Sequence, residues 1–357
     1  MKVLFIARAT LYESPGGDTV QILKTAQELR NFGVLVDVHI TTDKVCHDNY
    51  DIVHFFNIIR PADILWHFKR SKRTVISTIY VDYNESEKNT ASFFRKMLTY
   101  LLGSFNVEYL KTIGKAILGK EKIISKDYIF LGQYRAMKYL YKNSDALLPN
   151  SYSEMSRLNK TFGNTNAICD KIVNAIDIKK DIVPNNDFIG SIICIGRIER
   201  RKNQLNLIKA ANELNLPCFI IGKPALNDIG YYELCKQAAN DNIKFIENLP
   251  QEKIYSIMMA AKVHVLPSWF ETTGLVTLEA AYYGCNIVIT DKGDQKEYFK
   301  DFAIYCNPGD VDSIKHAILK AIDMPYNYEF KKIIATDYTW KNTAEQTKAV
   351  YDKLLLN

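Results

Sequence analysis

Residues 263–284 read Val-His-Val-Leu-Pro-Ser-Trp-Phe-Glu-Thr-Thr-Gly-Leu-Val-Thr-Leu-Glu-Ala-Ala-Tyr-Tyr-Gly. The first four residues predict a short buried strand, and Gly274 is placed to open a helix expected over 273–283. Glu271 precedes that helix and Glu279 lies inside it, so their carboxylates can contact different parts of one elongated ligand. A carboxylate can accept two hydroxyl hydrogen bonds, which suits a vicinal diol. The alternative is two unrelated surface glutamates.

The same alternation of short apolar runs and amphipathic stretches continues on both sides of this segment, which is typical of parallel α/β layers. In the C-terminal half, strands are expected at 192–195, 218–221, 244–246, 263–266, 287–290 and 303–305. In the N-terminal half they are expected at 3–7, 34–40, 52–56, 74–79, 146–148 and 167–173. The polar stretch 177–187 is expected to be a linker. We therefore predict two doubly wound domains, with ligand in the cleft where strand carboxyl ends meet.

The composition is that of an ordinary globular protein, with 47% hydrophobic and 24% charged residues among 357. The seven cysteines are scattered without a C-x-x-C pair, so neither a disulfide framework nor a zinc cluster is indicated. The six histidines have no metal-ligand spacing. We expect no metal and no cofactor. The first residues contain only a short apolar run, which predicts a cytoplasmic location.

The positive charge is concentrated between Ala91 and Lys142. This segment has ten basic and three acidic residues, a net charge of +7, while the whole chain carries +6 and the remainder therefore −1. Aromatic and aliphatic residues are interleaved with the cations, a mixture that suits contact with an anionic membrane. Ordinary surface helices with solvated lysines are the alternative. We do not expect a nucleic-acid partner.

Two further loops are candidates for binding phosphate. Gly16 and Gly17 allow a ligand close to the backbone before a helix N-terminus, and a tight turn capped by Asp18 is the alternative. Arg197 and Lys202 follow the first strand of the second half. A guanidinium fork and an ammonium group suit a diphosphate there, and a solvated basic loop is the alternative.

Taken together, these motifs resemble the GT-B-fold retaining glycosyltransferases of family four, the "glycosyl transferases group 1". The resemblance spans nearly the whole chain and is strongest over 191–290. The motifs that carry it, in the family's order, are Gly16-Gly17, Asp51 to His54, Asn174 to Asp177, Gly196-Arg197 to Lys202-Asn203, Pro267-Ser268, Glu271 to Glu279, Gly284 and Tyr338 to Trp340.

The resemblance implies an α/β fold of the GT-B class, in which two Rossmann-like domains face a central cleft. Residues 1–180 would bind the acceptor and carry the basic insertion 91–142, and residues 187–335 would bind a nucleotide sugar. Residues 336–357 would form a helix that packs back on the first domain. It also implies a front-face displacement assisted by the departing diphosphate.

The resemblance assigns roles residue by residue. Arg197 and Lys202 would hold the donor diphosphate, with helix N-termini in place of a metal. Glu271 would face the donor sugar hydroxyls and Glu279 the nucleotide ribose. The remaining donor contacts would come from the backbone of Thr273, Gly274 and Leu275, and from Gly16 and Gly17 on the opposite domain.

The sequence departs from the family pattern on the acceptor side. Many members carry a histidine where this chain has Tyr80, and the usual Asn-Gly-Ile-Asp has become Asn-Ala-Ile-Asp at 174–177. His54 is one possible substitute, and a packed, hydrogen-bonded histidine is the alternative reading. Tyr80 or Asp82 would then line the sugar pocket.

The predicted function is transfer of a sugar from a nucleotide-diphosphate sugar, UDP in preference to GDP, to a glycan or lipid-linked acceptor. Surface polysaccharide synthesis at the inner face of the membrane is the expected setting. A non-catalytic subunit that binds a nucleotide sugar is one alternative, and a sugar-nucleotide epimerase is another. The epimerase would need acid and base residues around the sugar, and the sequence offers no such cluster.

Overall fold

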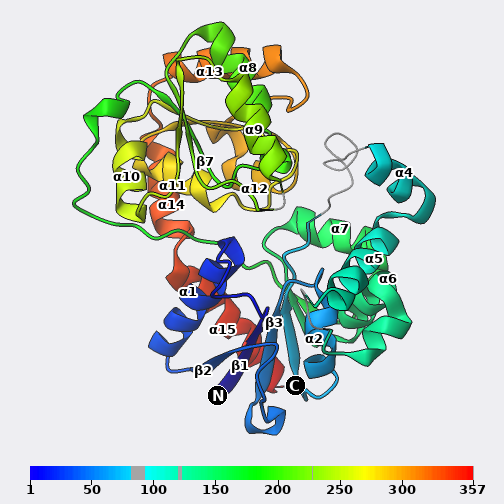
Figure 1. Ribbon diagram of the computed structural model, residues 1–357. Coiled ribbons are helices and arrows are strands. Elements are labelled where there is room, and N and C mark those ends of the chain that lie inside the picture. The colour runs from blue at the N-terminus through cyan, green and yellow to red at the C-terminus, as the bar shows by residue number, and fades with distance from the viewer. Residues whose placement is uncertain (82–92, 120–122, 227, 357) are drawn as a thin grey trace. The chain divides into compact units, whose positions relative to one another are not determined.

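The computed structural model describes residues 1–81, 93–119, 123–226 and 228–356 (Figure 1). The chain forms two compact units. Unit 1 contains the described residues of 1–175 together with the C-terminal segment that starts at Trp340, and unit 2 contains the described residues of 176–339. The last helix therefore belongs to the first unit. Among the described residues, no helix combines the length and apolar character needed to span a bilayer.

Unit 1 is built on a parallel sheet in the order β2-β1-β3-β4-β5-β6. Its strands are β1 (Lys2–Ala7), β2 (Leu35–Ile40), β3 (Ile52–Phe56), β4 (Thr74–Ser77), β5 (Ala146–Leu148) and β6 (Ile168–Cys169). The strand order reverses direction between β1 and β3. In doubly wound sheets a ligand site is expected at the carboxyl ends of the strands at such a point.

Both faces of this sheet are buried, because successive side chains of a strand point to opposite faces. Val3 and Phe5 of β1 enter a core completed by two helices, α1 (Gly17–Asn31) and α15 (Trp340–Leu356). Leu4 and Ile6 enter the opposite core. That core is covered by α2 (Pro61–Phe68), α6 (Lys126–Asn143) and α7 (Tyr152–Phe162).

The described part of the basic segment consists mainly of three helices joined by short non-helical stretches. After α4 (Phe93–Leu102) comes α5 (Ser104–Ile117), which packs against both α4 and α6. Gly103 separates α4 from α5 and Gly132 interrupts α6, each with a positive φ that an L side chain adopts only with strain. The glycines therefore divide this region into short helices that change direction.

Unit 2 is a second parallel sheet, in the order β12-β11-β10-β7-β8-β9. Its strands are β7 (Ile192–Ile195), β8 (Cys218–Ile221), β9 (Ile243–Ile246), β10 (Val263–Leu266), β11 (Asn286–Ile289) and β12 (Ile304–Tyr305). Numbered from its own first strand, this is the doubly wound order 3-2-1-4-5-6 read from β9, and its topological switch point lies between β7 and β10.

The helices of unit 2 cover both faces of its sheet (Figure 1). They are α8 (Gln204–Leu214), α9 (Ile229–Ala238), α10 (Gln251–Ala260), α11 (Leu275–Tyr283), α12 (Gln295–Phe299), α13 (Val311–Asp323) and α14 (Tyr328–Asp337). The decisive helix, α11, begins two residues later than expected. Gly274, with φ 72°, ends the loop in a left-handed conformation and acts as the N-cap.

Candidate functional site

The switch point of unit 2 brings together three charged residues, Arg201, Lys202 and Glu271. Lys202 and Glu271 were candidates from the sequence, and Arg201 is the neighbour of Lys202. The 3-10 turn η3 (Arg200–Lys202) follows β7, and Glu271 follows β10. The Lys202 ammonium donates to Glu271 Oε1, and the Arg201 guanidinium donates to the same oxygen at 2.9 Å. Arg201 also donates to the carboxylate of Glu199 at 2.7 Å. A buried carboxylate shared by two cations thus lies at the strand ends.

The ionisation of Glu271 is set by two opposing effects. Its side chain is 8% exposed, and burial alone raises a carboxyl pKa. The adjacent Lys202 and Arg201 charges outweigh burial, so the pKa of Glu271 is held below its ordinary value. Glu271 is therefore a fixed negative charge that orients two cations at neutral pH.

The backbone of Glu271 is fixed by a loop that the sequence motifs did not include. The Asp294 amide donates to the Glu271 carbonyl at 2.8 Å, and the Glu271 amide donates to the carbonyl of Lys292. Between them Gly293 has φ 86°, and a Cβ there would lie 1.9 Å from the Glu271 carbonyl oxygen. Only glycine allows this approach. The signal for it was a single glycine after β11, with no accompanying pattern.

Buried polar groups without partners gather at the start of α11. The Thr273 hydroxyl and both amide atoms of Gln295 find no hydrogen-bond partner among the residues that the structure describes, although both side chains are buried. A Cβ on Gly274 would lie 3.0 Å from the Gln295 amide nitrogen, so that side chain adjoins the helix N-cap. Buried polar groups are normally paired. An oxygen-rich ligand at the helix N-terminus would pair them.

Glu279, the fifth residue of α11, has a different environment. Its carboxylate accepts hydrogen bonds from the Tyr255 hydroxyl at 3.1 Å and from the Gln251 amide at 3.3 Å. Burial, helped by the nearby charge of Asp177, raises the pKa of Glu279 to about 7. The two glutamates of the motif are thus distinct: Glu271 is a permanent anion, and Glu279 changes charge near neutral pH.

The remaining residues that the sequence assigned to the donor lie in loops after strands or at the starts of helices. Arg197 follows β7 and is exposed, and its carbonyl accepts from the Gln204 amide at 3.0 Å. Leu275 is the first residue of α11. Gly17 is the first residue of α1, and Gly16 caps it with extended backbone that any residue can adopt. The described residues contain no group of three or more potential metal ligands.

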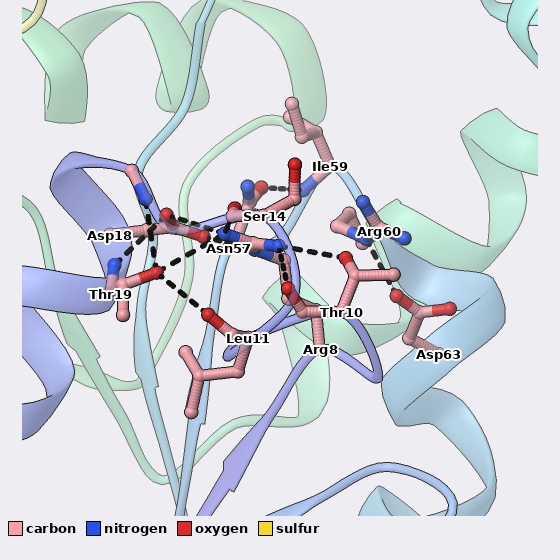
Figure 2. A network of polar contacts seen from close by, with 11 residues as sticks. Arg8, Thr10, Leu11, Ser14, Asp18, Thr19, Asn57, Ile59, Arg60 and Asp63 are labelled. Carbon is pink, nitrogen blue, oxygen red and sulfur yellow. Dashed lines mark hydrogen bonds and ion pairs between the residues drawn. The ribbon is translucent and has the colours of Figure 1, made fainter. Parts of the chain in front are cut away.

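The switch point of unit 1 is organised by Arg8, a residue to which the sequence analysis gave no role. Arg8 directly follows β1 and donates to both carboxylate oxygens of Asp18, at 2.6 and 3.1 Å (Figure 2). It also donates to the carbonyls of Thr10 and Ser14, both at 2.7 Å. Arg8 therefore ties the loop before Gly16 to the first turn of α1.

His54 is part of the unit 1 core. It is 1% exposed, its Nδ1 lies 2.5 Å from the Tyr351 hydroxyl on α15, and its Nε2 lies 2.9 Å from Ser77 Oγ. Burial lowers the pKa of His54 to about 3, so the ring is neutral. These contacts fit the alternative of a packed, hydrogen-bonded histidine, and we assign His54 to holding α15 on the sheet.

Tyr80 is held chiefly through its backbone. Its amide donates to Glu154 Oε1 at 2.6 Å, while its ring is buried and faces Phe162. Glu154 is wholly buried on α7 and also accepts from the Thr78 hydroxyl and, at 2.8 Å, from the Asn150 amide. Asp82 lies outside the described residues.

Residues 151–154 read Ser-Tyr-Ser-Glu, and a serine three residues before a glutamate at the start of a helix is typical of a capping box. One half is present, since Ser151 Oγ accepts from the Glu154 amide at 2.9 Å. The carboxylate instead reaches across to the loop after β4, as described above. Ile79 in that loop has φ 44°, an unusual conformation for a β-branched residue. Glu154 therefore secures a strained loop from both sides of Ile79.

Comparison with solved structures identifies the fold class as GT-B. Sucrose-phosphate synthase from Thermosynechococcus elongatus is 14% identical, with a TM-score of 0.75 over 100% of this chain and 99% of that chain. Anabaena HepE in complex with UDP and glucose is 13% identical, with a TM-score of 0.68 over 99% and 100%. WaaG, a glycosyltransferase involved in lipopolysaccharide biosynthesis, is 14% identical, with a TM-score of 0.61 over 98% of each chain.

At the level of sequence, the family model described as "Glycosyl transferases group 1" matches residues 177–336. The O-antigen chain mannosyltransferase B of Escherichia coli is 27% identical over 46% of this chain and 46% of its own. The Campylobacter jejuni enzyme that transfers N-acetylgalactosamine to a diphospho-undecaprenol acceptor is 28% identical over 45% and 46%. The chain spans about half the length of the curated relatives it matches.

Proposed function

We propose that this chain is a retaining glycosyltransferase of family four, which moves a sugar from a nucleotide-diphosphate sugar to a glycan or lipid-linked acceptor. The observation that carries the proposal is the cluster of Lys202, Arg201 and Glu271 at the switch point of unit 2. This cluster lies within the residues matched by the family model. The side-chain groups of Thr273 and Gln295, which find no partner within the described part of the chain, suit a phosphate or sugar.

The proposed chemistry follows from charge. Negative charge builds on the diphosphate as the glycosidic bond breaks, and oriented cations at that point lower the barrier. Lys202 and Arg197 would supply those cations, and Glu271 would hold Lys202 in place while facing the sugar hydroxyls. Because Glu271 is engaged by two cations, it is a poor covalent nucleophile, which favours front-face displacement over the two-carboxylate scheme of retaining glycosidases.

The proposed donor is a UDP-sugar, and the proposed reaction needs no metal, because the cations and the α11 N-terminus would neutralise the diphosphate. The UDP found in the HepE complex supports the choice of base. A lipid-linked acceptor, as in the C. jejuni relative, would bring unit 1 to the cytosolic face of a membrane. The membrane contact that we propose is through residues 91–142.

The test is nucleoside diphosphate release from UDP-glucose, UDP-N-acetylglucosamine and GDP-mannose by purified protein, with and without a lipid extract as acceptor. We expect Lys202→Ala and Arg197→Ala each to lower turnover, because each substitution should remove about 2–4 kcal/mol of transition-state stabilisation. Lys209→Ala, on the exposed face of α8, is the matched control. EDTA should leave turnover unchanged.

Three outcomes would contradict parts of this proposal. Donor binding without release or transfer would point to the non-catalytic subunit. Equal turnover in the Lys202 variant and the control would remove the diphosphate assignment. Loss of activity in EDTA that Mg²⁺ restores would show a metal requirement.

A further inference from the structure

Large apolar side chains are exposed along α4, α5 and the first part of α6. Tyr100 is 89% exposed, Ile117 is 81% exposed and Phe130 is 85% exposed. The neighbouring exposed apolar residues are Met97, Leu101, Leu102, Leu110, Leu118 and Ile129. Isolated exposed apolar residues are normal, but a contiguous group of them marks a contact surface. We call these nine residues, with the cations beside them, the α4–α6 surface.

The fold explains why these side chains face outward. Helix α5 turns Phe105, Tyr109 and Ile113 toward the unit 1 core. Leu110 and Ile117, two turns apart, share a different face of the same helix, so their exposure is built into the helical spacing. The Tyr109 hydroxyl donates to the Ile129 carbonyl at 2.7 Å, which fastens the first part of α6 beside α5. Gly132 then turns the chain back into the core.

Cations adjoin the apolar side chains. Lys96 is exposed on α4, Lys111 and Lys115 are exposed on α5, and Lys126 is exposed at the start of α6. The acidic residues described in this region are engaged by lysines: Glu108 pairs with Lys111 at 3.0 Å, and Asp127 pairs with Lys69 at 2.6 Å. The surface therefore combines apolar anchors with an excess of positive charge.

We propose that the α4–α6 surface docks on an anionic lipid bilayer, with its apolar side chains among the acyl chains and its lysines among the headgroups. Lysine side chains can lay their stems along apolar surface and keep the ammonium in the headgroup layer. The positive charge matches anionic lipid, whereas a second copy of the chain would place like charges against one another. The occupant to which the observations point is therefore a membrane.

This surface also adjoins the acceptor side of unit 1, so the inference deepens the proposed function and rests on it for the identity of the acceptor. The Phe105 ring, in the first turn of α5, lies 6.4 Å from the Phe162 ring, which in turn lies 6.2 Å from the Tyr80 ring after β4. Docking through α4–α6 would thus hold the carboxyl edge of the unit 1 sheet close to lipid headgroups. A sugar linked to a lipid through a diphosphate would lie just outside the headgroup layer, close to that edge of the sheet.

The test is co-sedimentation of the full chain with vesicles of phosphatidylcholine and phosphatidylglycerol in a 3:1 ratio, against phosphatidylcholine alone. We expect binding to the anionic vesicles at 50 mM NaCl and at least a tenfold lower partition coefficient at 500 mM. Salt screens headgroup attraction over a Debye length. Lys96→Gln, Lys115→Gln and Lys126→Gln together should lower partition to a similar extent.

The apolar contribution is tested separately by a triple variant, Tyr100→Ser, Ile117→Ser and Phe130→Ser. These side chains are mostly exposed, so the fold should not depend on them, and partition should again fall at least tenfold. The matched control is Val183→Ser, Ile189→Ser and Leu226→Ser in unit 2, where the exposed fractions are 77%, 69% and 92%. The control should bind vesicles like the parent chain.

The proposal is overturned if the parent chain stays in the supernatant with anionic vesicles at 50 mM NaCl, or if the control loses as much binding as the triple variant of Tyr100, Ile117 and Phe130. If the parent chain is a dimer in sedimentation velocity and that triple variant is a monomer, the surface binds a second copy of the chain instead. UDP binding, measured by thermal shift, should be the same in all variants. Vesicle binding without UDP binding would refute the proposed function and leave the docking surface standing.

Discussion

At the carboxyl edge of the unit 2 sheet, Glu271 is shared between two cations, and the buried groups of Thr273 and Gln295 have no partner among the described residues. At the same edge of unit 1, the buried carboxylate of Glu154 accepts three hydrogen bonds from nearby loops, and Arg8 is neutralised by Asp18. The unit 2 edge thus has buried polar groups that a ligand could pair, whereas the buried polar groups of the unit 1 edge hold that unit's own loops. We therefore expect ligand binding to stabilise unit 2 and substitutions in unit 1 to act through loop position.

The largest effect is expected at Gly293→Ala. The new Cβ would lie 1.9 Å from the Glu271 carbonyl oxygen, so the backbone that positions Glu271 must move. We expect a loss of about 4 kcal/mol in the free energy of unfolding, together with loss of UDP-dependent thermal stabilisation. Gly230→Ala is the control, because nothing lies within 4 Å of a Cβ at that position in α9. Equal stability of the two variants would contradict the close approach.

The counterpart in unit 1 is Glu154→Ala. It leaves the Thr78 hydroxyl and the Tyr80 and Asn150 amides without their acceptor, and the expected loss is about 3 kcal/mol of stability. UDP affinity should be unchanged, because the donor site that we propose around Glu271 lies in unit 2. Ser151→Ala removes the α7 N-cap and the hydrogen bond between the Ser151 and Ser153 hydroxyls, and it should cost about 1 kcal/mol. A change in UDP affinity with Glu154→Ala would show that the two edges are not independent.

The sequence predicted only part of this difference between the carboxyl edges of the two sheets. Strands β3, β5, β7, β8 and β10 have the bounds expected from their apolar runs, because a strand buried on both faces needs continuous apolar residues. Lys202 and Glu271 could each be named from the sequence because both follow strand ends, but the direct contact between them was not predicted. Gly293, Arg201 and Arg8 were missed, because their roles depend on how loops from different strands approach one another. Helix α14 was also missed.

A smaller effect is expected when the pH is lowered, and it belongs to unit 1. His54 in the unfolded chain binds a proton near pH 6.5, but in the folded chain its pKa is about 3. Between these two pH values the unfolded state binds more protons than the folded state. The contribution of His54 to the free energy of unfolding is therefore complete above pH 6.5 and is lost progressively as the pH drops. Between pH 6.5 and 5 we expect His54 to account for about 2 kcal/mol of lost stability.

Urea unfolding of the parent chain and of His54→Gln at the two pH values measures this contribution. The variant should lose less stability than the parent on acidification. His316→Gln, at an exposed position on α13, is the control and should keep the parent's dependence. Parallel profiles for the parent and His54→Gln would mean that the ring accepts a proton in the folded state.

The smallest effect is expected in unit 2, at Glu279. Its pKa is raised to about 7, and its ionised form is the better acceptor for two ribose hydroxyls. Affinity for UDP-glucose should therefore rise about tenfold from pH 6 to pH 8, or about 1.4 kcal/mol. UDP-glucose is used because its diphosphate diester does not itself titrate in this range. Calorimetry on Glu279→Gln should give a nearly flat profile, and a profile as steep as the parent's would remove Glu279 from ribose recognition.

The return of α15 to unit 1 has a consequence for the order in which the protein is made. Val350, Tyr351 and Leu354 fill the core beside α1, and Tyr351 meets His54. A ribosome must synthesise all of unit 2 before these residues exist, which takes roughly 10–30 s at about 5–20 residues per second. During that interval unit 2 can fold as a continuous stretch of nascent chain. Unit 1 waits with an open apolar groove, a natural target for chaperones, until its final helix emerges.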